Sequence, residues 1–338
     1  MTAPRVAAQS ALRIAAQSAL SVAAQSALRV VSLLPSATEI VAALGFADAL
    51  VGRSHECDYP EEVADLPVCT EAKVNPAGSS EEIHRSVNAL LAESLSVYRV
   101  DAERLRALAP THVVTQVQCQ VCAVSLEEVE AALAGWTGER PRLTPLNPGS
   151  LADVLADIER VGAALGAPER GRRLAASIRA SMEAIAERAS AIPFRPRVVT
   201  LEWLSPLMTA GNWMPEIIAM AGGRDLLGAA RTHSSWIEWE TVRAADPDVL
   251  LVFPCGFPLE RVVREIGLLT ERPGWAALRV VSEGRVYLAE ANQYFNRPGP
   301  RLLETLEIVA EILHPQDFAF GHEGKGWLRL TRAGARLE

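Results

Sequence analysis

The sequence has no run of about eighteen apolar residues, which argues against a transmembrane segment. It also has no block of lysine and arginine, and its net charge is −8, so no basic nucleic-acid-binding face is expected. Near the N-terminus the apolar stretch is interrupted by polar residues, unlike the continuous hydrophobic region of a secretory signal peptide. We therefore expect a monomeric protein located in the cytoplasm rather than the periplasm.

The motifs of common catalytic sites are missing as well. There is no glycine-rich phosphate loop, no Gly-x-Ser-x-Gly and no convincing pair of carboxylates. Gly222 and Gly223 directly follow a predicted helix, a position where glycine commonly ends helices. We therefore interpret the pair as a helix C-terminal cap and not as a phosphate-binding loop. No enzymatic activity is predicted.

Residues 5–28 repeat one octapeptide three times: RVAAQSAL, RIAAQSAL and SVAAQSAL. Eight residues turn a helix by about 800°, so each repeat is rotated by about 80° from the last and leaves no continuous apolar stripe. An interaction arm would need such a stripe to dock. We interpret residues 1–28 as an extension without a binding role.

From residue 29 onward, short apolar runs alternate with helical patterns, which is typical of an α/β fold with parallel sheets. Strands are predicted at 30–34, 49–52, 112–116, 142–146, 197–201, 249–253 and 285–288, and helices at 36–44, 80–95, 100–108, 125–134, 150–165, 215–221, 259–268 and 300–313. The spacing of Ser36 and Glu39, and of Ser125 and Glu128, predicts capping boxes.

Residues 168–191 form one uninterrupted helical pattern, about 36 Å long at 1.5 Å per residue. Prolines at 193 and 196 end it. We predict two α/β lobes joined by this rigid helix. The boundaries are 1–28 (extension), 29–166 (first lobe), 167–192 (linking helix), 193–318 (second lobe) and 319–338 (tail).

The five cysteines are an odd number, which favours free thiols or metal ligands over a disulfide framework. Four follow predicted strands that would face a cleft between the lobes: Cys57, Cys119, Cys122 and Cys255. With His55 and His233 nearby, they could hold zinc or an iron–sulfur cluster. Isolated buried thiols are the simpler interpretation, and a redox pair of Cys119 and Cys122 is a third.

Aromatic residues make up 5% of the chain, yet several fall in predicted loops at strand ends. These are Trp203, Trp213, Trp236, Trp239, Tyr294 and Phe295. Rings that line a cleft bind large planar ligands by stacking. The group is predicted to include ligand contacts.

The segments RVVSLLPSATEI, VGRSHECDYP, AERLRALAPTHVV, RVVTLEWLSPLMTAG, ADPDVLLV and YFNRPGPRLLE occur in this order over residues 29–316. Together they resemble the class III substrate-binding proteins of bacterial ABC importers, most of all the cobalamin-binding members. The resemblance implies two lobes joined by a long, rigid helix, with the ligand held between them.

The resemblance also implies roles for particular residues. Tyr294 and Phe295 match an aromatic pair that contacts cobalamin, and Trp236 lies near another cleft aromatic. Glu103 matches an acidic residue that pairs with permease arginines, and Glu216 is the nearest second-lobe counterpart.

Three features depart from the family pattern. Glu56 and Gln116 replace two typical cleft aromatics, the cysteines are unusual, and the loop between Cys69 and Val100 is enlarged.

Two hypotheses follow. The first is a non-catalytic protein that binds a corrinoid, cobalamin or a precursor, as a small-molecule metal chelate and delivers it to an ABC permease. Its ligand contacts would be Tyr294, Phe295, Trp236, Trp213, Trp203, Gln116 and Glu56. The alternative is an intracellular metal, iron–sulfur or redox protein that uses the cleft cysteines on the same scaffold.

Overall fold

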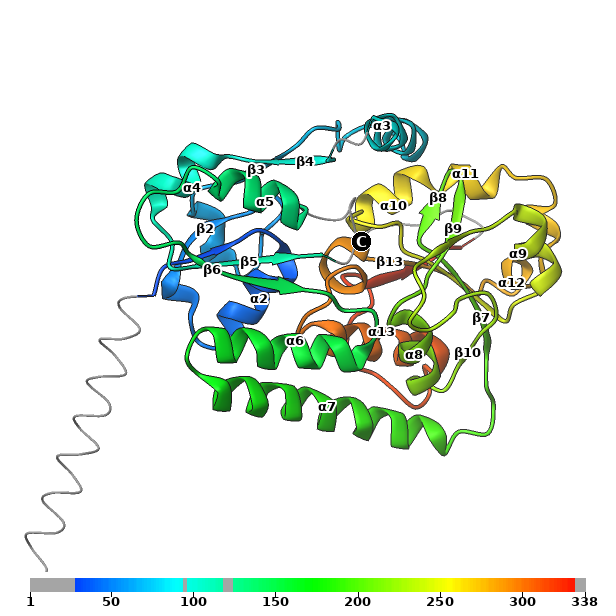
Figure 1. The fold of residues 1–338 in the computed structure, drawn as a ribbon. Coiled ribbons are helices and arrows are strands. Elements are labelled where there is room, and N and C mark those ends of the chain that lie inside the picture. Colours follow the sequence, from blue (N-terminus) through cyan, green and yellow to red (C-terminus); the bar gives the residue numbers. More distant parts are fainter. Residues whose placement is uncertain (1–27, 94–95, 118–123, 332–338) are drawn as a thin grey trace, which may run out of the picture.

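The computed structural model describes residues 28–93, 96–117 and 124–331. The chain forms two α/β lobes, with one long helix running along the side of both (Figure 1). The fold class predicted from the sequence is confirmed.

The first lobe is built on a four-stranded parallel sheet in the order β2-β1-β5-β6. Its strands are β1 (Val30–Ser32), β2 (Leu50–Arg53), β5 (His112–Gln116) and β6 (Arg142–Leu146). Around them lie α2 (Pro35–Ala43), η1 (Ala47–Ala49), η2 (Glu61–Asp65), α4 (Ala102–Leu108), α5 (Leu126–Leu133) and α6 (Leu151–Ala164). The observed β5 and β6 have the predicted bounds.

Helix α2 does not begin with the predicted capping box. Its N-cap is Leu34, Pro35 occupies its first turn, and no side chain caps it. Pro35 suits the first helical position because it has no N–H to satisfy. The helix therefore begins one residue earlier than predicted, and Glu39 is left to interact elsewhere. Of the second predicted capping box, the N-cap half is confirmed, since the Ser125 side chain accepts a hydrogen bond from the Glu128 amide.

The second lobe has a five-stranded sheet in the order β10-β7-β12-β13-β14. Its strands are β7 (Arg197–Leu201), β10 (Arg224–Asp225), β12 (Val249–Val252), β13 (Val286–Ala289) and β14 (Trp327–Arg329); β8 (Trp203–Leu204), β9 (Leu207–Thr209) and β11 (Ser235–Trp236) form a separate small sheet. Its helices are α8 (Met214–Met220), α9 (Trp239–Ala245), α10 (Leu259–Glu265), α11 (Gly267–Thr270), η3 (Trp275–Ala277), α12 (Arg279–Ser282), η4 (Ala291–Phe295) and α13 (Leu302–Leu313).

Strand β14 lies within the segment that was predicted to be a tail. It pairs antiparallel with β13, and the Trp327 indole donates to the buried carboxylate of Glu311. Residues 327–329 therefore belong to the sheet of the second lobe.

The enlarged loop of the first lobe folds into an arm, which we define as β3 (Thr70–Ala72), α3 (Ser80–Ala92) and β4 (Tyr98–Val100). The two strands pair antiparallel, and α3 lies next to α10 of the second lobe (Figure 1). The sequence analysis predicted α3 but neither short strand, and it placed residue 100 in a helix.

Helix α7 (Pro168–Ser190) is the predicted linking helix, and it packs against α6, α8 and α13. A Cβ at Gly162 would lie 2.9 Å from the Gly171 Cα, so α6 and α7 approach backbone to backbone. One continuous apolar cluster contains buried residues from both lobes, among them Ile40, Ile158, Met182, Ile217 and Leu306. A shared core of this kind opposes large movements of one lobe relative to the other.

Candidate functional site

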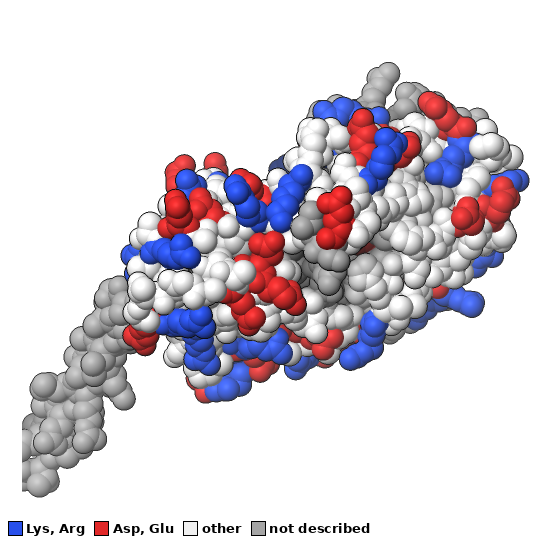
Figure 2. Space-filling model, turned by 45° about the horizontal axis from the view of Figure 1, so that its top comes forward, with Lys and Arg blue, Asp and Glu red and all other residues white. Residues whose placement is uncertain are grey.

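The candidate site lies where the carboxyl ends of the parallel strands in the two lobes approach each other, the usual ligand position in open α/β sheets. The first lobe contributes α2 after β1 and residues 54–59 after β2. The second lobe contributes η4 after β13 and residues 296–301. The surface is hollowed between the lobes, with acidic side chains beside the hollow (Figure 2).

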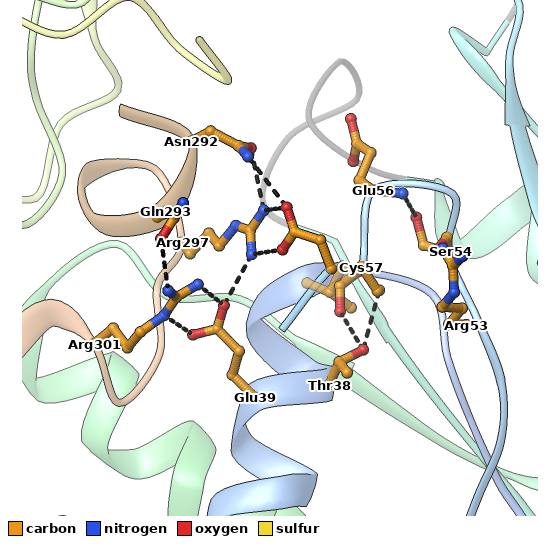
Figure 3. A network of polar contacts seen from close by, with 12 residues as sticks. Thr38, Glu39, Arg53, Ser54, Glu56, Cys57, Asn292, Gln293, Arg297 and Arg301 are labelled. Carbon is orange, nitrogen blue, oxygen red and sulfur yellow. Dashed lines mark hydrogen bonds and ion pairs between the residues drawn. The ribbon is translucent and has the colours of Figure 1, made fainter. Parts of the chain in front are cut away.

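A buried ionic network joins the lobes at this site. The Glu39 carboxylate accepts hydrogen bonds from Arg297 Nη1 at 3.1 Å and from Arg301 Nη2 and Nε at 2.6 and 2.9 Å (Figure 3). The three side chains are at most 7% exposed. Because the carboxylate and the guanidinium groups come from different lobes, the network fixes the relative position of α2 and residues 297–301.

Asp58 extends this network toward the solvent. Arg297 binds it through two nitrogens, at 2.6 and 3.0 Å, and the Asn292 amide donates to the same carboxylate at 3.3 Å. Partial burial alone would raise the pKa of Asp58, but the hydrogen bonds and charge of Arg297 outweigh burial and lower it. Both sides of this interlobe link therefore stay charged at neutral pH.

Two tyrosines, one from each lobe, flank the guanidinium of Arg301. Its central carbon lies 4.2 Å from the centre of the Tyr59 ring and 5.5 Å from that of Tyr294. Tyr59 is 48% exposed, and Tyr294 is partly buried. Burial raises the pKa of Tyr294, so its phenol stays protonated and can donate a hydrogen bond. The pair provides aromatic surface on both sides of the site.

Glu56 was predicted as a ligand contact and lies beside the network (Figure 3). Tyr98 of the arm donates to its carboxylate at 3.1 Å. Burial raises the pKa of Glu56, and this effect outweighs the Tyr98 hydrogen bond. The other predicted polar contact, Gln116, is buried at the end of β5.

The raised pKa of Glu56 predicts a pH-dependent gain in stability on replacing it. The folded protein favours the neutral carboxyl, so stability falls as the pH rises above the unfolded value of about 4.3 and through the raised folded pKa. Glu56→Gln should therefore raise the Tm at pH 7, and the difference should disappear near pH 4. Thermal unfolding at both pH values tests this, with the exposed Glu61→Gln as a control that should change neither Tm. An equal or lower Tm at pH 7 would contradict it.

Three of the aromatic residues predicted as ligand contacts are core residues instead. Phe295 is fully buried and stacks on Phe253 with ring centres 4.6 Å apart. The Trp213 indole donates to the carbonyl of Phe295, and Trp203 packs edge-on against Phe257. Their position after strands indicated the cleft, but the chain turns these rings into the second lobe.

Trp236 has a different environment, because 54% of it is exposed. It lies on the short strand β11, and its ring meets His84 of the arm edge-on at 5.0 Å. It is an aromatic surface of the second lobe that remains available to a ligand.

The described cysteines do not form a metal centre. No three His, Cys, Asp or Glu side chains in the described ranges are grouped as metal ligands. Cys57 is buried, accepts a hydrogen bond from Thr38 at 3.0 Å, and has its pKa raised by burial to about 11, which disfavours the thiolate that metals bind. Cys255 is partly buried, and Cys119 and Cys122 lie outside the described residues.

The two predicted docking residues have different surroundings. Glu103 is exposed on α4. Glu216 accepts a hydrogen bond at 3.0 Å from the Leu151 amide at the start of α6. Glu216 thus supports the contact between lobes, whereas the Glu103 side chain faces the solvent.

The residues of the ionic network were not predicted as site residues. Glu39 and Arg297 are 258 positions apart, so no local pattern connects them. The available signals were the segments around Asp58 and Arg297, each of which directly follows a predicted strand end.

Two α/β lobes on a common helix, with charged and aromatic side chains gathered between them, define a bilobed ligand-binding protein. Residues 30–292 match the family model of the periplasmic binding proteins, and the chain belongs to that family. The predicted family resemblance is confirmed.

Similar proteins cover nearly the whole fold. An uncharacterized ABC transporter substrate-binding lipoprotein of Bacillus subtilis, YvrC, is 26% identical over 86% of this chain and 81% of that protein. The vitamin B12-binding protein of Vibrio campbellii is 25% identical over 84% and 88%.

Solved structures show the same architecture. The heme-binding protein RhuT of Roseiflexus sp. RS-1 has a TM-score of 0.63 and 27% identity, over 85% of this chain and 98% of that one. The vitamin B12-binding protein BtuF of Vibrio cholerae shares the fold, with a TM-score of 0.61 and 21% identity over 84% and 96%.

The predicted cytoplasmic location is wrong. It depended on the interrupted apolar stretch near the N-terminus, whereas the family is that of periplasmic binding proteins and one relative is a lipoprotein. These findings point to a location outside the cytoplasm. Among the helices of the described part, none is long and apolar enough to cross a membrane.

Proposed function

We propose that this protein binds a corrinoid, cobalamin or a precursor, between its two lobes. The observation that carries the proposal is the pairing of Tyr59 and Tyr294 from opposite lobes around Arg301. A large, flat ligand that enters between the lobes would contact aromatic surface from both of them. Vitamin B12-binding relatives support the choice of ligand.

The charges of the site distinguish a corrinoid from heme, the second candidate, which is supported by the similar heme-binding structure. Heme carries two carboxylates that need cationic partners. Both buried arginines of the site are already bound by Glu39 and Asp58. The amide side chains of a corrinoid need neutral donors and acceptors instead, which Gln293 and Tyr294 provide, whereas the Asn292 amide already belongs to the ionic network.

Equilibrium titration with cyanocobalamin and with hemin tests this proposal. We expect saturable cobalamin binding with a Kd below about 100 µM, and weaker binding of hemin. Tighter binding of hemin would favour the second candidate. Absence of saturable binding of cobalamin in this range would reject the corrinoid.

We further propose that the protein delivers its ligand to an ABC importer, in keeping with the Bacillus subtilis relative, which is named as an ABC transporter substrate-binding lipoprotein. Exposed Glu103 is the residue that we assign to permease docking. Glu216 is not assigned, because its carboxylate already holds the start of α6.

A further inference from the structure

The arm makes a specific, largely buried contact with the second lobe. The backbone amide of Ser80, at the start of α3, donates to Glu265 of α10 at 3.1 Å, and the Ser80 hydroxyl bonds the same oxygen. Arg261 pairs with the other oxygen of Glu265 at 3.1 Å and donates to the carbonyls of Pro76 and Gly78. The Arg261 and Glu265 side chains are only 13% and 16% exposed.

Apolar and aromatic contacts reinforce this clamp. Ile83 of α3 packs against the hydrophobic cluster of the second lobe, whereas Val87, one helical turn later, packs against a cluster of the first lobe. His84 meets the Trp236 ring. Helix α3 therefore contacts both lobes at once. An isolated helix of 13 residues is only marginally stable in water, so these contacts hold it in place.

The docking surface of the arm is connected to the candidate ligand site through Phe257. The guanidinium of Arg261 lies 3.6 Å from the centre of the Phe257 ring. The carbonyl of Phe257 accepts hydrogen bonds from the amides of Ala291 and Asn292 at 3.2 and 3.1 Å, and Glu290 accepts one from the Leu259 amide at 2.6 Å. Residues 257–265 thus contact both the arm, through Arg261 and Glu265, and η4, through Phe257. Helix η4 carries Asn292 and Tyr294.

We propose that the arm covers one side of the cleft between the lobes. In this proposal, α3 must detach from α10 before a bound ligand can dissociate. The part that concerns the ligand rests on the proposed function. Arg261 and Glu265 are positioning residues in this proposal, because they act on the ligand through α3 and η4.

Two arginines of α10 provide a matched test. Arg261 holds the arm, whereas Arg264, on the same helix, is exposed. In hydrogen exchange of the ligand-free protein, Arg261→Ala should make the amides of residues 83–92 exchange at least about tenfold faster, whereas Arg264→Ala should leave them unchanged. Exchange in α13 should stay constant and shows that the fold is intact. If Arg261→Ala disturbs α13, Glu265→Gln replaces it as the milder variant.

The second readout is the dissociation rate of cyanocobalamin, or of hemin if the titration favours hemin. We expect at least fivefold faster release from Arg261→Ala and an unchanged rate from Arg264→Ala. Unchanged exchange in α3 would overturn the docking of the arm, and faster exchange with an unchanged release rate would overturn its role in retention. If neither probe binds, the proposed function fails, and the exchange data still decide whether the arm is held by Arg261.

Discussion

Replacing Glu39 by alanine is expected to lower the free energy of unfolding by about 3–5 kcal/mol, because removing one partner of a buried ion pair leaves an uncompensated charge. Here two guanidinium groups, those of Arg297 and Arg301, would lose their shared carboxylate while remaining almost fully buried. Asp58 would still bind Arg297, so Arg301 should account for most of the loss. Denaturant unfolding of the purified variant measures the change.

The control for this variant is Asp48→Ala, which removes an exposed carboxylate from the same lobe. Surface substitutions of this kind change stability by no more than about 0.5 kcal/mol. If Glu39→Ala cost less than about 1 kcal/mol, the network would not be the buried connection between lobes that the structure shows.

Replacing Tyr294 by alanine is expected to weaken cobalamin binding by about thirtyfold, since truncating a central aromatic contact costs about 2 kcal/mol or more. The ring lies beside Arg301 at the interlobe site, and its backbone carbonyl is held independently by the Thr305 hydroxyl at 2.7 Å. Loss of the ring should therefore leave the backbone of η4 in place. Titration of the variant with cyanocobalamin gives the change in Kd.

Two further variants make this result specific. Tyr294→Phe keeps the ring and should weaken binding by less than threefold, provided that stacking is the main contribution. Phe194→Ala removes an aromatic residue that is 54% exposed and follows α7, and it should not change the Kd. Helix α7 itself runs along the side of the molecule opposite the arm (Figure 1). Equal losses for Tyr294→Ala and Phe194→Ala would show that the effect does not come from the cleft.

The sequence was sufficient for the elements that depend on local patterns. The strands at 112–116, 142–146 and 197–201 have the predicted bounds, because short apolar runs between polar segments indicate buried strands. The long linking helix was predicted to within one residue, since its apolar spacing is regular and prolines follow it. The short strands β3 and β4 were missed because three-residue strands in a turn-rich segment leave no clear periodicity.

The site was harder to predict because it depends on contacts between distant segments. Glu39 matched a capping-box spacing, and only the structure shows that its carboxylate turns to the arginines of the other lobe. Phe295 and Trp213 were selected because they follow predicted strands, and both do lie near strand ends. A position after a strand does not determine whether a ring faces the cleft or the core, and both rings are buried. Tyr59 was overlooked although it follows Asp58 in the same predicted loop.

A crystal structure of the complex with cyanocobalamin would test the central claim most directly. The account predicts that the corrin ring lies between the lobes, in contact with Tyr59 and Tyr294. A ligand bound elsewhere, for example in the cavity of about 520 Å³ beside Arg142 and Arg160 at the edge of the first sheet, would contradict it.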